Sequence, residues 1–156
     1  MRPIHALSFE EILLRLALGA LLGIAIGVER QWRQSAAGIQ TSSLVCVGAT
    51  LYSTIAPALG IEDIRILAGL VTGVGFLAGG VILKEGMNVR GLNTAATIWA
   101  TAAVGALCGV GLLEEASIAT MVIISLNLFF LPLADWIDRR VAARIKSLGH
   151  GDTKHD

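Results

Sequence analysis

Eight polar residues near the ends of apolar stretches are the ones whose types and spacing could do chemistry. They are two carboxylates, two arginines, two amides and two threonines, namely Glu29, Arg30, Gln40, Thr41, Glu85, Arg90, Asn93 and Thr94. Carboxylates can bind cations, whereas arginines and helix amino termini attract anions. The simpler explanations are that each threonine caps a helix and that water solvates the charges. Capping is the favoured explanation for the threonines. For the charges, solvation and a functional cluster stand equal.

Four of these residues belong to an internal repeat. Residues 38–45 and 91–98 share a glycine, an aliphatic residue, an amide, a threonine and two small residues, and the second copy starts 53 residues after the first. Each copy follows a charged loop and opens an apolar stretch. The repeat therefore predicts two helical hairpins of the same orientation, related by a pseudo-two-fold axis along the membrane normal. Chance similarity between small-residue helix starts is the alternative.

The elements that position these residues are five apolar stretches of membrane-spanning length. A span needs about 20 predominantly apolar residues, and the chain is 54% hydrophobic and 15% charged over 156 residues, with a mean hydropathy of +0.73. We expect an all-α integral membrane protein with five transmembrane helices, two parallel-repeat hairpins plus a fifth helix. The transmembrane domain is expected over residues 7–136 and a basic tail over 137–156. The spans are placed at Ile12–Val28, Ser42–Leu59, Ile64–Leu83, Thr94–Leu113 and Ala116–Ala134.

The distribution of positive charge predicts the topology. Nine of the twelve Lys and Arg residues fall in the loops 29–41 and 84–93 and in the tail, which five spans place on one side. By the positive-inside rule that side is the cytoplasm, so the amino terminus lies outside and the carboxyl terminus inside. Arg15, within the first span, is expected to pair with Glu11 one turn earlier.

Glycines spaced four residues apart predict close helix packing, because small residues let helix backbones approach in lipid. They are Gly19, Gly23 and Gly27 in the first span, Gly69, Gly73, Gly75 and Gly79 in the third, and Gly105 and Gly109 in the fourth. We expect these faces to bundle the helices of one chain. A homodimer is the alternative use.

Several other functions lack a basis in the sequence. Residues 73–78 fit a dinucleotide-binding pattern, but they lie in mid-span, where that motif does not work. Metal-ligand spacing and a nucleophile with its base are both missing, so no enzymatic activity, cofactor, metal or nucleic-acid partner is expected. Cys46 and Cys108 are expected to be buried and unpaired, about 14 Å apart in depth.

Four blocks of the sequence resemble the MgtC/SapB family of bacterial inner-membrane proteins. The resemblance covers about residues 12–133, and the last block is the most specific. The blocks are Gly27-Val28-Glu29-Arg30-Gln31, Ala37-Gly38-Ile39-Gln40-Thr41, Gly73-Val74-Gly75-Phe76-Leu77-Ala78-Gly79-Gly80-Val81-Ile82 and Val89-Arg90-Gly91-Leu92-Asn93-Thr94-Ala95-Ala96-Thr97-Ile98-Trp99. The best-known members continue into a soluble domain of ACT-like fold, so the resemblance implies a short form.

The resemblance implies a non-enzymatic membrane regulator. Members are associated with growth at low magnesium and with virulence inside macrophages, and are thought to bind other membrane proteins, including the F-type ATP synthase. The implied location is the bacterial inner membrane. The alternative is a small magnesium or proton transporter or channel, with Glu29 and Glu85 as its site carboxylates. No span has an acidic residue at its middle, so a midplane cation site would need carbonyls or hydroxyls such as those of Thr72, Thr97 and Thr101.

Overall fold

The computed structural model describes residues 7–56, 63–86 and 88–149. Its helices are α1 (Phe9–Trp32), α2 (Ile39–Ile55), α3 (Asp63–Gly79), α4 (Leu92–Val110) and α5 (Leu113–Gly149). Each helix covers most or all of one predicted span. The protein is therefore a helical membrane protein, as the sequence predicts.

Length and apolarity single out three of the described helices as able to cross a membrane. They are α1, α4 and the part of α5 from Leu113 to Phe130. Helices α2 and α3 have 17 residues each, which corresponds to about 26 Å at 1.5 Å per residue. The count of five spans thus stays a prediction, because the hydrocarbon core of a bilayer is about 30 Å thick.

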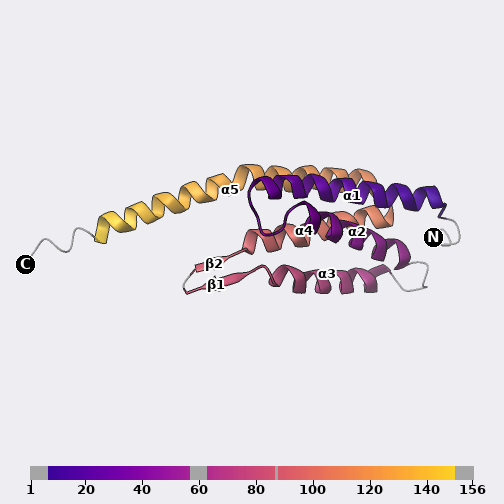
Figure 1. The fold of residues 1–156 in the computed structure, drawn as a ribbon, viewed down its shortest axis with the longest axis horizontal. Coiled ribbons are helices and arrows are strands. Elements are labelled where there is room, and N and C mark those ends of the chain that lie inside the picture. The colour runs from indigo at the N-terminus through magenta and orange to yellow at the C-terminus, as the bar shows by residue number, and fades with distance from the viewer. Residues whose placement is uncertain (1–6, 57–62, 87, 150–156) are drawn as a thin grey trace, which may run out of the picture. The chain divides into compact units, whose positions relative to one another are not determined.

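The chain divides into two compact units, residues 1–123 and 124–156. Within the first, α2 and α4 form the centre, with α1 packed on one side and α3 on the other (Figure 1). The core between the helices consists mainly of small residues, such as Ala49, Ala95 and Ala102. In the second unit, α5 continues as a helix past residue 136, where the sequence predicts a separate tail, and Arg140 stacks 4.4 Å from the centre of the Trp136 ring.

The loop predicted over residues 84–93 contains a β-hairpin. Strand β1 (Leu83–Glu85) pairs antiparallel with β2 (Asn88–Arg90), and Leu83 lies opposite Arg90. Gly91 follows directly and is the N-cap of α4, with a φ of 89°. Glycine is required at position 91 for two reasons. The backbone there is left-handed, and a Cβ would meet the Val81 carbonyl oxygen.

Helices α2 and α4 run in the same direction, but α4 extends farther at its amino end. A Cβ on Gly105 would strike the Cys46 carbonyl oxygen, and a Cβ on Gly109 would lie 2.6 Å from the Thr50 carbonyl oxygen. Cys108, one turn after Gly105, is therefore much nearer to Cys46 in depth than the predicted 14 Å. The prediction was wrong because it aligned the two helix starts. Both cysteines are buried and free.

The amino end of α1 differs from the predicted ion pair. Ser8 and Glu11 form a capping box, with bonds of 3.0 and 3.2 Å between each side chain and the other residue's backbone amide. Arg15 instead donates a 2.6 Å bond from Nη1 to the carbonyl oxygen of Gly109. This cation thus satisfies a carbonyl in the last turn of α4, where the helix dipole favours positive charge.

Candidate functional site

The most unusual chemistry among the described residues surrounds Arg30, in the last turn of α1. Its side chain is only 3% exposed. Nη2 donates to Ser35 Oγ at 2.7 Å and to Thr94 Oγ1 at 3.0 Å, and the two hydroxyl oxygens are themselves 3.0 Å apart. One guanidinium nitrogen therefore joins α1, the loop that follows it and the first turn of α4. We call Glu29, Arg30, Arg33, Ser35 and Thr94 the Arg30 cluster.

A tight turn after α1 brings Ser35 to Arg30. The Ser35 amide bonds back to the Arg30 carbonyl at 3.1 Å, and the Gln34 amide bonds to the Gln31 carbonyl at 3.0 Å. Gln34 takes a positive φ of 53°, which turns the chain across the helix end. The Ser35 hydroxyl then lies beside Thr94, although the two residues are far apart in sequence.

The buried guanidinium of Arg30 is only partly hydrogen-bonded within the described residues. Arg30 Nε and Nη1 are buried and have no hydrogen-bond partner among the described residues. The adjacent carboxylate is engaged elsewhere, since Glu29 Oε1 lies 2.9 Å from Arg33 Nε. Unsatisfied buried donors are costly. The carbonyl end of α1 offsets part of that cost, because it favours a cation.

The structure brings only some of the predicted site residues together. Glu29, Arg30 and Thr94 meet in the Arg30 cluster. Within the described part of the chain, the exposed side chains of Gln40, Thr41, Arg90 and Asn93 form no hydrogen bond or ion pair with that cluster. Glu85 ends β1, and its side chain lies outside the described residues. Sequence reasoning missed Arg33 and Ser35. The i,i+4 spacing from Glu29 could have identified Arg33, but no local pattern identifies Ser35.

The predicted threonine caps are wrong. The N-caps are Gly38 for α2 and Gly91 for α4, and neither has a side-chain cap bond. Thr41 and Thr94 lie three residues inside their helices. The Thr94 hydroxyl is instead part of the Arg30 cluster, because α1 reaches this end of α4 and supplies a charged donor.

The hydroxyls considered for a midplane cation site are bonded within their own helices. Thr72, Thr97 and Thr101 each donate to the carbonyl four residues earlier, at 2.7 to 2.9 Å. Among the described residues, no three His, Cys, Asp or Glu side chains group as they would to hold a metal ion.

The glycine faces are used unequally. In α1, a Cβ on Gly19, Gly23 or Gly27 would lie 2.5 to 2.8 Å from atoms of α2, and in α4 Gly105 and Gly109 also press against α2. In α3, by contrast, nothing described lies within 4 Å of the Cβ positions of Gly69, Gly73, Gly75 and Gly79. The expected packing within the chain is therefore not made at these four α3 positions, because α3 contacts α4 and α2 through other residues.

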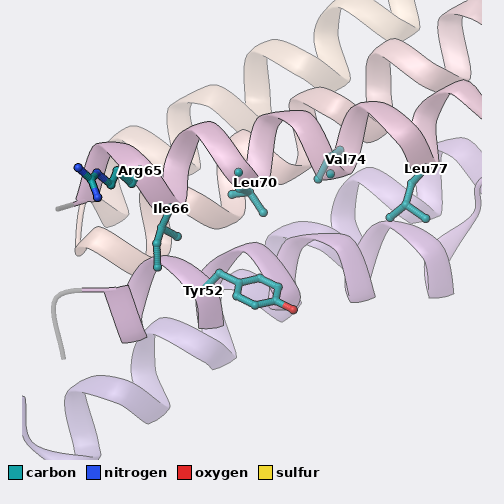
Figure 2. A pocket seen from close by; sticks show the side chains of 8 residues that line it. Tyr52, Arg65, Ile66, Leu70, Val74 and Leu77 are labelled. Carbon is teal, nitrogen blue, oxygen red and sulfur yellow. The ribbon is translucent and has the colours of Figure 1, made fainter. Parts of the chain in front are cut away.

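Two of the α3 glycines leave room for a groove between α2 and α3. Figure 2 shows it bordered by Tyr52 of α2 and by the side of α3 that runs from Arg65 to Leu77. Its volume is about 570 Å³, and Gly69 and Gly73 lie in its wall. We call it the α2–α3 groove. Gly75 and Gly79 do not line it.

Comparison with known proteins identifies the family. The MgtC family profile matches residues 16–136, most of the chain. This chain belongs to the MgtC family. The protein MgtC of Brucella abortus is 43% identical over 149 residues, which cover 89% of this chain and 63% of that protein. MgtC of Salmonella typhimurium is 45% identical over 128 residues, covering 81% and 55%.

A further relative and the search of solved structures complete the comparison. An uncharacterized protein of Synechocystis sp. is 47% identical over 136 residues, covering 86% of this MgtC-family chain and 58% of the relative. The chain thus spans about three fifths of the length of the curated relatives it matches. No solved structure matches it.

Proposed function

We propose that this chain is a non-enzymatic membrane regulatory protein that acts by binding another membrane protein during adaptation to low magnesium or to stress inside a host. Its membership of the MgtC family supports this role. The F-type ATP synthase is the first partner to test, on the strength of the family resemblance. The expected location is the bacterial inner membrane, with the amino terminus outside and the carboxyl terminus in the cytoplasm.

The observation that carries the proposal is the open small-residue face of α3. Gly75 and Gly79 have no described atom within 4 Å of their Cβ positions, whereas the glycines of α1 and α4 are covered by α2. Thr72 is exposed on the same face. Close backbone approach is a main source of affinity between helices in lipid. This face therefore suits a helix of the partner protein.

A photocrosslinking experiment tests the proposal. Phe76 adjoins Gly75 and is 85% exposed, while Leu44 of α2 is 64% exposed. A benzoylphenylalanine at position 76 should crosslink the partner in isolated membranes, and one at position 44 should not. Mass spectrometry of the adduct then shows whether it contains an ATP synthase subunit, another protein or a second copy of this chain.

Matched double substitutions complete that test. Gly75→Leu with Gly79→Leu should abolish the crosslink and growth at low magnesium, whereas Gly69→Leu with Gly73→Leu should preserve both. Loss of membrane insertion is checked by fractionation. A crosslink to a second copy alone, or full growth of the Gly75/Gly79 variant, would overturn binding of another protein through this face.

The alternative function, ion transport, is favoured by one observation. Glu29 is only 8% exposed and lies beside a buried arginine, and such carboxylates often mark ion or proton paths. Magnesium and proton flux into proteoliposomes decides the matter. Flux that disappears in a Glu29→Gln, Glu85→Gln variant would replace the regulator proposal, whereas inserted protein without flux would support it.

A further inference from the structure

The α2–α3 groove has features that the proposed docking of a partner helix does not use. Six of its lining residues are apolar or glycine along α3, and Arg65 stands at one end (Figure 2). Arg65 is exposed and forms no hydrogen bond or ion pair with any described residue. An apolar groove that ends at a cation complements an amphiphile with an anionic head.

The length of the groove fits one leaflet of a bilayer. From Arg65 to Leu77 α3 advances by about 18 Å at 1.5 Å per residue. One leaflet contributes about 15 Å, half of the hydrocarbon thickness. A spanning partner helix would extend through both leaflets, whereas an acyl chain whose head lies at Arg65 would end near Leu77.

The walls of the groove also suit an acyl chain. Gly69 and Gly73 supply no side chain, and nothing described lies within 4 Å of their Cβ positions. Ile66 and Leu70 offer apolar contact on the α3 side. Tyr52, which is 62% exposed, forms the opposite wall, and Figure 2 shows its ring lying along the groove. Aromatic rings of this kind gather near membrane interfaces.

We propose that the α2–α3 groove binds a glycerophospholipid with an anionic headgroup, its phosphate at Arg65 and one acyl chain along Gly69 and Gly73. The site is separate from the Gly75 and Gly79 face of α3, so it goes beyond the regulator proposal and can fail independently of it. The bound molecule would occupy the space between α2 and α3 and join them at the Arg65 end.

Native mass spectrometry of the purified full chain with added lipids tests the site. Dioleoylphosphatidylglycerol should bind more tightly than dioleoylphosphatidylcholine. Arg65→Gln should weaken phosphatidylglycerol binding about fivefold, the effect expected of one basic residue near a lipid surface, and Arg65→Lys should restore it. Arg65 is exposed, so its variants should remain folded, which circular dichroism verifies.

Two further measurements distinguish the contribution of the lipid's acyl chain from that of its headgroup. Gly69→Leu with Gly73→Leu should abolish binding of both lipids, while Gly75→Leu with Gly79→Leu should leave both unchanged. Millimolar inorganic phosphate should not displace the lipid, since a free ion lacks the acyl chain.

Three results would overturn the proposal. They are equal binding of the two lipids, unchanged binding in both Arg65→Gln and the Gly69/Gly73 variant, and displacement of the lipid by phosphate alone. A polypeptide that copurifies with the wild type and is lost from the Gly69/Gly73 variant, with lipid binding unaffected, would assign the groove to a helix instead.

Discussion

Arg30 is a buried cation whose side-chain hydrogen bonds to described residues come from a single guanidinium nitrogen. Its Nη2 has two hydroxyl partners, while Nε and Nη1 have none among the described residues. Each of the two hydroxyls comes from a different segment, so the arginine couples the end of α1 to the start of α4. A buried charge with few partners makes each remaining bond important.

Replacement of Thr94 by valine should destabilise the protein by about 1 to 3 kcal/mol, because it removes one acceptor of a buried charged donor. The matched control is Thr97→Val, one turn later, since among the described residues the Thr97 hydroxyl bonds only to a carbonyl of its own helix. SDS titration followed by circular dichroism measures both variants. Equal stability of the two would show that the bond between Arg30 and Thr94 contributes little.

At the scale of elements, the main distinction is between glycines that are covered and glycines that are open. Those of α1 and α4 admit the backbone and side chains of α2, while those of α3 admit nothing described. The same sequence pattern thus has two different uses. Covered glycines determine how closely helices of one chain approach, and open ones leave surface for a ligand or partner.

Gly105→Ala should lower stability by about 1 to 3 kcal/mol, the usual cost of overpacking, because its Cβ would strike the Cys46 carbonyl oxygen. Gly75→Ala is the matched control in α3. There the added methyl meets open space, so helix propensity should leave stability equal or slightly higher. Thermal unfolding in detergent compares the pair. A Gly105→Ala variant as stable as wild type would mean that α2 and α4 are packed less closely.

The junction of the β-hairpin with α4 offers a second matched pair. Gly86 and Gly91 both have positive φ, 62° and 89°, but only Gly91 has a backbone atom against its Cβ position. An alanine at either position should cost about 1 to 2 kcal/mol for the left-handed backbone. Gly91→Ala should cost more, because it must also displace the Val81 carbonyl. Identical melting temperatures would contradict the close approach.

At the scale of the whole molecule, the orientation of the protein in the membrane decides which side each proposed site faces. The Arg30 cluster, the β-hairpin and the amino end of α4 belong to segments in which positive charge is concentrated. Under the proposed orientation, which follows the positive-inside rule, these segments lie on the cytoplasmic side and the Arg65 end of the α2–α3 groove opens toward the outer leaflet.

Reporter fusions check this orientation. Green fluorescent protein fused after Asp156 should fluoresce, and alkaline phosphatase fused there should be inactive, because both results require a cytoplasmic carboxyl terminus. Phosphatase fused between Gly60 and Ile61 should be active. The reverse pattern would contradict the proposed orientation, since it would place the Arg30 cluster outside and the Arg65 end of the groove on the cytoplasmic side.

The sequence by itself determined the class of protein, the positions of the helices and the family. These follow from local properties: each apolar stretch must satisfy its own backbone as a helix in lipid, and the repeat places Gly38 and Gly91 at equivalent helix starts. The polar residues Glu29, Arg30 and Thr94 could also be selected from their places at those ends.

Only the tertiary structure decided which of these residues meet. Ser35 joins Arg30 and Thr94 because a turn at Gln34 carries it over the end of α1, and α2 starts deeper than α4, which brings Gly105 to the Cys46 carbonyl. The glycines of α1 and of α3 share a spacing, yet only the former are covered. Spacing defines the face of a helix, whereas long-range packing of the other helices determines what lies against it.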